Sequence, residues 1–195
     1  RFEGLPSITL EEVDHRAGSA QAQRGSPASS PSRSRGSLDA PVATSPSFAE
    51  AIRKAVAVAR YDDPVLILGE TGTGKTMIAR RIHGESLRKG GPFVEVNCSA
   101  IPESLAESEL FGHARGAFSG ADKARSGKFR AAHGGTLFLD EIGDLSLELQ
   151  AKLLKALEDK EVTPVGSDEP VRAEARLIAA TNRDIPELIR TGRFR

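Results

Sequence analysis

The chain has 195 residues, of which 27 are Lys or Arg and 27 are Asp or Glu, so its formal net charge is zero. This balance excludes a strongly basic nucleic-acid arm or an acidic tail as the main feature, and the single cysteine excludes an internal disulfide. No apolar stretch approaches the roughly 20 residues that a membrane helix needs, so we expect a soluble, cytoplasmic protein with no membrane partner.

The first 44 residues divide into two segments. We expect residues 1–24 to be the end of an upstream region, in which the apolar residues could form the end of a preceding domain or a strand that docks on the next one. Ser, Pro and Gly dominate residues 25–44, which hold too little apolar surface to offset chain entropy, so we expect a flexible linker there. Because the chain begins with Arg1 and ends at Arg195 in a charged segment, we expect a fragment of a longer protein.

Residues 45–195 alternate between segments typical of helices and segments typical of buried strands. Apolar residues at helical spacing predict helices over residues 45–60, 75–87, 146–158 and 185–190. Short apolar runs predict strands over residues 64–68, 93–96, 136–139 and 177–180. Strands that alternate with helices predict an α/β fold with a parallel sheet covered on both faces.

A glycine-rich segment between the first predicted strand and the second predicted helix matches G-x-x-x-x-G-K-[ST] at every fixed position. It consists of Gly69, Glu70, Thr71, Gly72, Thr73, Gly74, Lys75 and Thr76. Glycines let backbone N–H groups turn toward phosphate oxygens at the helix N-terminus. Lys75 would neutralise the β and γ phosphates of ATP, and Thr76 would supply a hydroxyl to Mg²⁺. The alternative is a strand-to-helix turn with a solvated lysine.

Two acids end the third predicted strand. Because successive side chains of a strand point in opposite directions, Asp140 and Glu141 can serve different partners. Asp140 would hold Mg²⁺ through water, while Glu141 would orient and deprotonate the attacking water. The alternative is that these carboxylates only mark where a strand meets solvent.

Polar residues follow two further strands, at the edge where a parallel sheet binds its ligand. Asn97 follows the second strand, and Thr181 and Asn182 follow the fourth. Either asparagine could reach toward the γ-phosphate or the catalytic acid. Equally, Asn97 could cap a turn and Asn182 the helix over residues 185–190, and spacing favours neither interpretation.

A glycine-rich loop over residues 112–121 places Phe118 at its centre. An exposed aromatic there indicates a contact with another macromolecule, and the alternative is that Phe118 folds back onto the core. His83, His113 and His133 have no carboxylate partner at catalytic spacing, so we expect ordinary surface or capping residues.

Together these residues resemble the central ATPase domain of sigma-54-dependent transcription activators, the bacterial enhancer-binding proteins of the AAA+ class. The likeness covers about residues 45–195 and runs through residues 69–76, 96–98, 109–113, 116–121, 134–142 and 180–183. Its most specific part is similar to the family's sigma-contacting loop: Gly116, Ala117, Phe118, Ser119, Gly120 and Ala121.

The resemblance implies a P-loop NTPase of AAA+ type that hydrolyses ATP in a ring-shaped homo-oligomer, a hexamer in keeping with the family, and drives Phe118 against sigma-54 in the closed promoter complex. It implies that Asn97 holds Glu141 inactive until the loop engages sigma-54, and that Thr181 and Asn182 sense the γ-phosphate. Arg195 would reach the neighbouring subunit's nucleotide. Residues 162–171 fall where the family has a second loop that moves with the first.

Three features depart from the family pattern. Ser119 stands where the family usually has Thr, and Thr76 stands where many members have an acid. The chain also ends before the second finger arginine and the helical lid, so we expect the isolated fragment to hydrolyse ATP poorly or not at all. DNA would be contacted only through a domain missing from this chain. The alternatives are a generic AAA+ remodelling ATPase with another target and a nucleotide-binding module without turnover.

Overall fold

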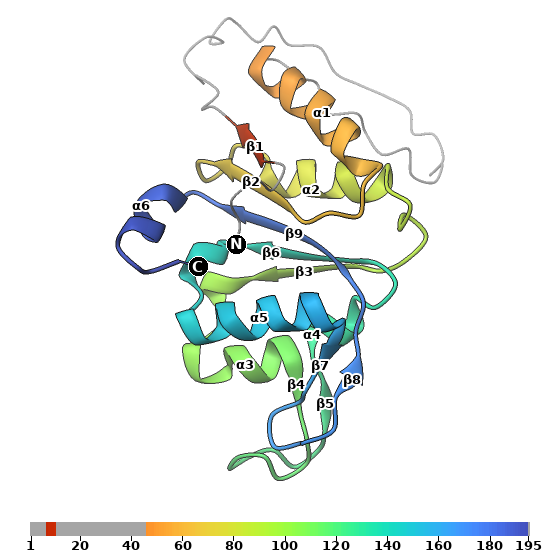
Figure 1. Cartoon of the computed structure of the whole chain (residues 1–195), viewed down its shortest axis with the longest axis vertical. Coiled ribbons are helices and arrows are strands. Elements are labelled where there is room, and N and C mark those ends of the chain that lie inside the picture. Colours follow the sequence, from red (N-terminus) through yellow and green to blue (C-terminus); the bar gives the residue numbers. More distant parts are fainter. Residues whose placement is uncertain (1–6, 11–45, 195) are drawn as a thin grey trace, which may run out of the picture.

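The computed structural model describes residues 7–10 and 46–194, in which helices cover both faces of a parallel sheet (Figure 1). Five strands form this sheet in the order β1-β2-β9-β6-β3, and every neighbouring pair is parallel. The strands are β1 (Ser7–Leu10), β2 (Val65–Gly69), β3 (Phe93–Asn97), β6 (Thr136–Asp140) and β9 (Arg176–Thr181). Their carboxyl ends therefore share one edge of the sheet, and the predicted α/β fold is confirmed.

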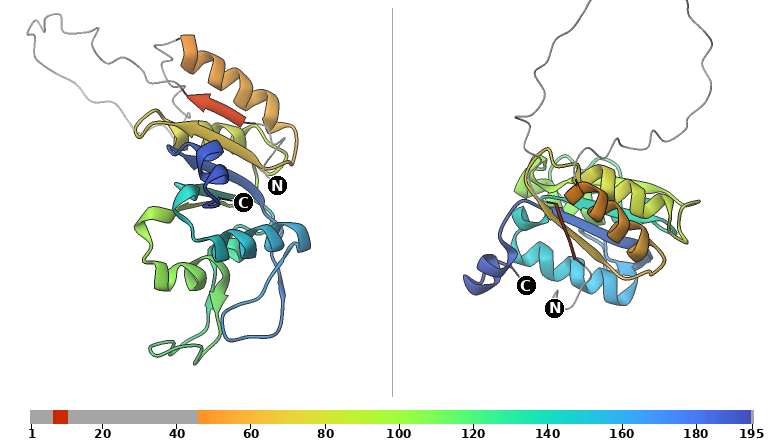
Figure 2. Two further views of the ribbon diagram at one scale, coloured as in Figure 1. Left: turned by 60° about the vertical axis from the view of Figure 1, so that its left-hand side comes forward. Right: turned by 90° about the horizontal axis from the view of Figure 1, so that it is seen from above.

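Helices lie in two layers, one on each side of the sheet (Figures 1 and 2). One layer holds α1 (Pro46–Ala59) and α2 (Lys75–Gly84), and the other holds α3 (Glu103–Phe111) and α5 (Leu147–Asp159). Shorter helices are η1 (Cys98–Ala100), α4 (Lys128–Ala131), η2 (Ile142–Asp144) and α6 (Ile185–Arg190). Among the described residues, no helix has the length and apolar character needed to cross a membrane.

Strand β6 shows how the two layers are held. Leu137 and Leu139 enter the hydrophobic cluster that contains α3 and α5, whereas Phe138 enters the cluster that contains α1 and α2. All three side chains are fully buried. Burial on both faces explains why residues 137–139 of this strand are all apolar.

The predicted strands and helices are present, with ends that differ from the predictions by at most three residues. The largest difference is at α2, which was predicted to reach residue 87 and ends at Gly84. Ser86 closes this end, because its backbone N–H and its hydroxyl both donate to the carbonyl of His83, at 3.0 and 2.7 Å. Helix α3 was not predicted.

Strand β1 decides between the two interpretations of the apolar residues near the N-terminus. It pairs with β2 from Ser7 opposite Leu66 to Leu10 opposite Gly69. The side chain of Ile8 is fully buried in the cluster that contains α1 and α2. In the structure this segment is therefore a strand of the core sheet, while the predicted linker over residues 25–44 lies outside the described residues.

Two antiparallel ribbons project from the layer of α3 and α5, and we call them together the arm (Figure 1). One ribbon pairs β4 (Gly112–His113) with β5 (Arg125–Ser126), and the other pairs β7 (Glu161–Val162) with β8 (Val171–Arg172). The ribbons are joined by hydrogen bonds of 2.9 Å, in which Ala114 N–H donates to Val165 and Val165 N–H donates to Gly112. Both predicted loops thus belong to one arm.

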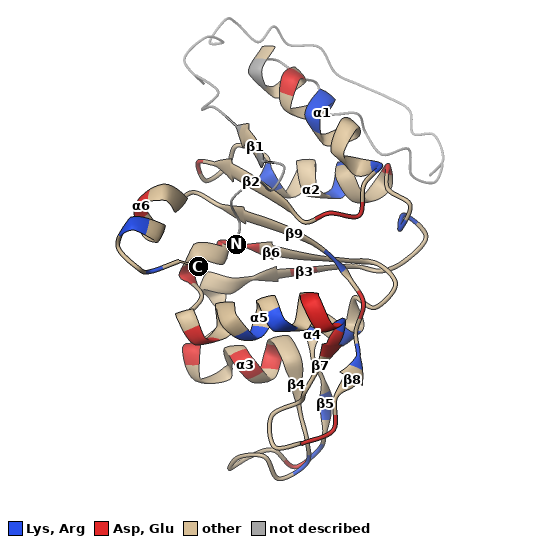
Figure 3. Ribbon diagram, viewed as in Figure 1, with Lys and Arg blue, Asp and Glu red and all other residues tan. Residues whose placement is uncertain are grey.

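Glu174 lies where the arm returns to the sheet, in a region where acidic and basic residues mix (Figure 3). Its carboxylate forms ion pairs with Lys160, Arg172 and Arg88, at 3.1, 3.1 and 3.4 Å. Its backbone N–H donates to Nδ1 of His133 at 3.0 Å. The hydrogen bonds from Lys160 and Arg172 lower the pKa of Glu174 to about 2, so this carboxylate stabilises the base of the arm while it is ionised.

We expect the substitution Glu174→Gln to lower the melting temperature at neutral pH. Because the pKa of Glu174 is lowered from 4.5, its contribution is fully present above pH 4.5 and is lost as the pH falls toward the folded pKa. Thermal denaturation at about pH 6 and pH 3 should therefore show a difference in melting temperature that narrows at the lower pH.

The matched control is Glu158→Gln, because Glu158 is exposed and has no ion pair within the described part of the chain. This variant should melt like the unsubstituted protein at both pH values. An equal loss at both pH values for Glu174→Gln would contradict the proposed role of its charge.

Candidate functional site

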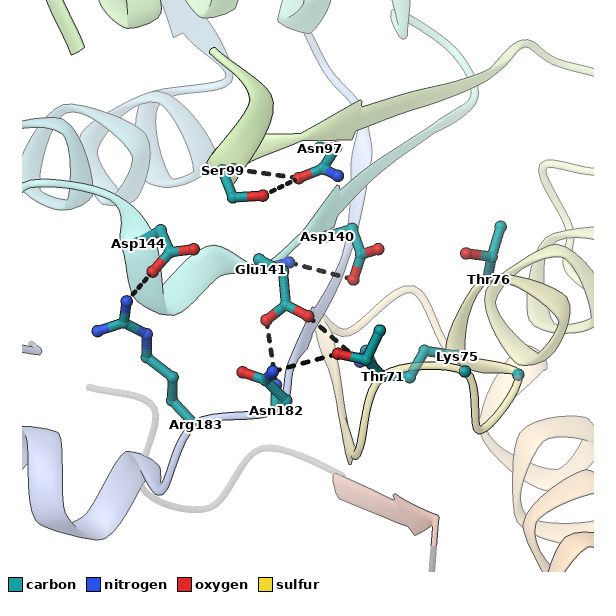
Figure 4. A pocket seen from close by; sticks show the side chains of 12 residues that line it. Thr71, Lys75, Thr76, Asn97, Ser99, Asp140, Glu141, Asp144, Asn182 and Arg183 are labelled. Carbon is teal, nitrogen blue, oxygen red and sulfur yellow. Dashed lines mark hydrogen bonds and ion pairs between the residues drawn. The ribbon is translucent and has the colours of Figure 1, made fainter. Parts of the chain in front are cut away.

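A cavity of about 550 Å³ lies at the carboxyl edge of the sheet, lined by the glycine-rich segment and the ends of β3, β6 and β9 (Figure 4). The predicted residues that line it are Thr71, Gly72, Gly74, Lys75, Thr76, Asn97, Asp140, Glu141 and Asn182. Sequence reasoning missed three further lining residues: Ser99, Asp144 and Arg183. The fold thus brings Thr71 within hydrogen-bond distance of Asn182, 111 positions away.

Four other predicted residues lie beside this cavity. Gly69, Glu70 and Thr181 line a neighbouring cavity of about 570 Å³, bounded by β2, β9 and α6. Thr73 shapes the turn, because its hydroxyl donates to the carbonyl of Glu70 at 2.8 Å. Thr181 is fully buried, and its Oγ1 accepts from the N–H of Arg183 at 3.1 Å.

The glycine-rich segment turns sharply where it enters α2. Gly72 and Gly74 have φ values of 87° and 91°, in the left-handed region that glycine adopts at little cost. A Cβ atom at Gly74 would also lie 3.2 Å from the ring of Phe48 on α1. The turn places backbone N–H groups at the positive end of the α2 dipole, which is an arrangement that binds phosphate.

Lys75 carries a nearly buried positive charge, since the residue is 6% exposed. Its Nζ donates to the carbonyls of Gly69 and Glu70 at 3.0 and 3.2 Å, and lies 3.3 Å from Oε1 of Glu141. A buried ammonium group needs partners of this kind to offset its desolvation. Glu141 is its carboxylate partner among the described residues (Figure 4).

The carboxylate of Glu141 is held between the end of β9 and the start of α2. Its Oε2 accepts from the backbone N–H of Asn182 at 3.1 Å, while its Oε1 faces Lys75. Its backbone is left-handed, with φ 53° and ψ 49°, which is uncommon for a residue with a side chain. This conformation turns the carboxylate from the end of β6 into the cavity (Figure 4).

Asp140 faces the same cavity and lies opposite Asn97 in the sheet register. Its Oδ1 accepts from the backbone N–H of Glu141 at 3.1 Å. Burial raises the pKa of Asp140, while the positive charge of Lys75 opposes the shift. A cation near Asp140 would favour its ionised form.

Asn97 lines the cavity but does not hold Glu141. Its Oδ1 accepts from the backbone N–H and the hydroxyl of Ser99, at 3.1 and 2.7 Å, and so caps η1. The expectation that Asn97 contacts Glu141 is therefore wrong for this structure. The cause is local, because the first N–H groups of η1 need an acceptor.

Asn182, unlike Asn97, does not cap a helix. Asp184, not Asn182, caps α6, because its side chain accepts from the N–H of Glu187 at 3.1 Å. The Nδ2 of Asn182 instead donates to Thr71 Oγ1 at 3.3 Å. The capping interpretation of Asn182 is wrong, and its side chain belongs to the cavity (Figure 4).

Arg183 and Asp144 form an ion pair at the rim of the cavity (Figure 4). Arg183 directly follows Asn182, and Asp144 lies three positions beyond Glu141. Their positions beside predicted site residues were the available signal, but nothing in the sequence paired them. The ion pair links the end of β9 to η2, close to both predicted acids.

The predicted sigma-contacting loop lies in the arm and not at the cavity. Phe118 is 39% exposed, as expected, while the adjacent end of the loop, Ala121, is buried. His113 is half-buried and has no carboxylate partner among the residues that the structure describes, as expected, but its ring also contacts Phe118, with centroids 5.0 Å apart. His83 also has a partner, Thr136 Oγ1 at 2.9 Å.

Arg195 lies outside the described residues, so its predicted role stays a prediction. The chain that leads to it is anchored, since Phe194 is buried in the cluster with α5. Nε2 of Gln150 donates to the carbonyls of Leu145 and Arg193, at 2.8 and 3.3 Å.

The oxygen donors at the cavity fit a magnesium ion that arrives with a nucleotide. No group of three or more His, Cys, Asp or Glu residues in the described ranges could hold a metal ion. Mg²⁺ keeps several waters and takes one or two carboxylates besides phosphate oxygens. The Thr76 hydroxyl and the Asp140 carboxylate, which both line the cavity, are donors of this hard type.

Comparison with known proteins gives a family and several relatives. The family described as the Sigma-54 interaction domain matches residues 42–195. The nitric oxide reductase transcription regulator NorR1 of Cupriavidus necator is 62% identical over 138 residues, which cover 71% of this chain and 27% of that protein. The regulatory protein LuxO of Vibrio cholerae is 59% identical over 131 residues, which cover 67% of this chain and 25% of that protein.

Solved structures show the same fold. A crystal structure of NtrX from Brucella abortus matches with a TM-score of 0.72 and 35% identity, over 80% of this chain and 34% of that one. The structure of NtrX in complex with ATP matches with a TM-score of 0.68 and 35% identity, over 78% of this chain and 34% of that one. The chain spans about a quarter of the length of the two curated relatives named above. Because the family match covers most of its residues, the chain belongs to the sigma-54 interaction domain family, with a P-loop fold of AAA+ type.

Proposed function

We propose that the chain is the ATPase core of a sigma-54-dependent transcription activator. It hydrolyses ATP in an oligomeric ring and uses the energy to remodel the closed promoter complex of sigma-54 RNA polymerase. The observation that carries this proposal is the pairing of Lys75 with Glu141 in a cavity that the phosphate loop lines. Support comes from the family match and from the NtrX structure in complex with ATP.

Nucleotide binding changes the partners of Lys75. Phosphate oxygens that enter the loop compete with Glu141 for the ammonium group, which lies 3.3 Å from Oε1. Oε1 is then free to accept a proton from water, while Oε2 keeps the N–H of Asn182. The bond between this water oxygen and the γ-phosphorus forms as the bond to the β,γ-bridging oxygen breaks, and ADP leaves.

The Thr76 hydroxyl and the Asp140 carboxylate would hold Mg²⁺ at the phosphates. When bound, the ion neutralises negative charge on the β and γ phosphates. The side chain of Asn182 donates to Thr71 Oγ1 beside the cavity, and this contact with the phosphate loop supports a role for Asn182 in sensing a bound γ-phosphate. We assign Mg²⁺ to these donors because they are oxygen ligands of the type that it prefers.

The proposal also includes an oligomeric ring of subunits and a protein partner, sigma-54. A homo-oligomer, a hexamer by family resemblance, would let Arg195 of one subunit approach the nucleotide of its neighbour. The Phe118 loop would contact sigma-54, and DNA would be bound by another domain. Two other functions are the alternatives, a AAA+ ATPase with a different target and a nucleotide-binding module without turnover.

The role of Lys75 can be tested by replacing its charge. We expect Lys75→Met to weaken binding of a fluorescent ATP analogue by about 10- to 100-fold, because hydrogen bonds from a charged donor are lost. Equilibrium titration of the full-length protein measures this change. Lys89→Met, at an exposed position away from the cavity, should bind normally, and an affinity for Lys75→Met within about twofold of normal would contradict the assignment.

The partner can be tested by trapping. The full-length protein, loaded with ADP and aluminium fluoride as a γ-phosphate mimic, should co-migrate with purified sigma-54 on gel filtration. Phe118→Ala should abolish the complex because the exposed ring of the arm is lost. The control Leu87→Ala removes another exposed apolar side chain, 87% exposed and outside the arm, and should leave the complex intact.

Each other outcome of this experiment has a defined meaning. If the mimic binds and the unsubstituted protein forms no complex, the sigma-54 proposal is wrong and the chain is an ATPase with another target. If the transition-state mimic does not bind and ATP is not hydrolysed, the result favours the second alternative, a nucleotide-binding module without turnover. If Phe118→Ala forms the complex equally well, sigma-54 contacts a surface other than the Phe118 loop.

A further inference from the structure

Both ring nitrogens of His113 form hydrogen bonds, one with a side chain of α3 and one with the backbone of the arm. Nδ1 lies 2.7 Å from Oγ of Ser108 on α3, and Nε2 lies 3.1 Å from the backbone carbonyl of Lys123. A carbonyl oxygen only accepts, so Nε2–H donates to Lys123, and in the neutral ring Nδ1 accepts from the Ser108 hydroxyl. These two bonds fix the plane of the imidazole ring.

The ring of Phe118 packs on this fixed imidazole. The two centroids are 5.0 Å apart and the planes meet at 61°, which is an edge-to-face contact. Phe118 is still 39% exposed. One part of its ring is therefore held by His113, while another part stays available to a partner.

The surrounding backbone supports the same position. Ala121 N–H donates to the carbonyl of Phe118 at 3.0 Å, and Gly116 N–H donates to the carbonyl of Ala121 at 2.9 Å. The second ribbon approaches so closely that a Cβ atom at Gly166 would lie 2.7 Å from Cβ of Ala117. The turn is thus closed by its own hydrogen bonds, and the side chain of Phe118 is oriented from outside the turn.

We propose that His113 is a positioning residue that pre-organises Phe118 for its protein partner, with Ser108 holding His113 in place. A ring that is already oriented loses less conformational entropy when it binds. The proposal deepens the proposed function and rests on it in one respect, because it takes the partner to be sigma-54. The contact between His113 and Phe118 itself does not depend on that assignment.

The first test needs no partner. Trifluoromethyl-phenylalanine at position 118 of the full-length protein gives one ¹⁹F resonance that reports the environment and mobility of the ring. We expect His113→Ala to move this resonance toward its position in the denatured protein and to narrow it. His113→Gln should restore part of the shift, because its side-chain N–H can donate to the Lys123 carbonyl.

Two further variants control this test. Ser108→Ala removes only the hydroxyl at Nδ1, so it should change the resonance in the same direction by a smaller amount. It also replaces His113→Ala as the test if that variant fails to fold. His133→Ala removes another histidine, outside the arm, and should leave the resonance unchanged.

The second test measures affinity for sigma-54 in the presence of ADP and aluminium fluoride. We expect His113→Ala to weaken binding about tenfold, in keeping with the loss of one aromatic contact and its supporting hydrogen bond, and His113→Gln to recover part of it. An unchanged ¹⁹F resonance in both His113→Ala and Ser108→Ala, or unchanged or tighter binding by His113→Ala, would overturn the proposal.

The two levels of the proposal fail differently. If the unsubstituted protein does not bind sigma-54, the proposed function is wrong, and the ¹⁹F resonance still decides whether His113 orients Phe118. If the unsubstituted protein binds and the resonance does not respond to His113, only the positioning role is wrong.

Discussion

The nearly buried ammonium group of Lys75 is the constraint around which the site is arranged. The desolvation of this charge must be offset by hydrogen-bond acceptors and an opposite charge. The structure supplies two carbonyls of the phosphate loop and the carboxylate of Glu141. The same carboxylate also accepts from Asn182 at the end of β9. In the proposed mechanism, a phosphate group that pairs with Lys75 would release Glu141 from this ion pair, and so would connect nucleotide binding to the group that activates water.

The parallel sheet brings the residues of the cavity together, and α3 connects this cavity to the arm. Because the five strands of this sheet are parallel, the loops after β2, β3, β6 and β9 meet at one edge. From Asn97 and Ser99 at the cavity, the chain continues through η1 and α3 to His113. Glu107 on α3 is also paired with Lys152 on α5 at 2.8 Å. One helix thus joins the nucleotide cavity to the base of the arm.

Sequence reasoning predicted the sheet and the phosphate loop because both depend on local patterns, namely apolar runs and a fixed glycine and lysine spacing. It missed α3, whose buried residues include Ser108 beside Leu110 and Phe111 and so blur the helical period. Whether Asn97 or Asn182 caps a helix depends on the exact residue at which that helix begins, and sequence patterns place helix ends only to within one or two residues. The role of His113 depends on a backbone carbonyl ten positions away, which no side-chain pattern reveals.

The most direct measurement of the central claim compares ATP affinity with ATP turnover for Glu141→Gln in the full-length protein. Turnover should fall by about 100-fold or more, because the general base is lost. Affinity for ATP should be retained or increased, because Lys75 no longer pairs with a carboxylate that competes with phosphate. Normal turnover, or a joint loss of turnover and affinity, would contradict the account.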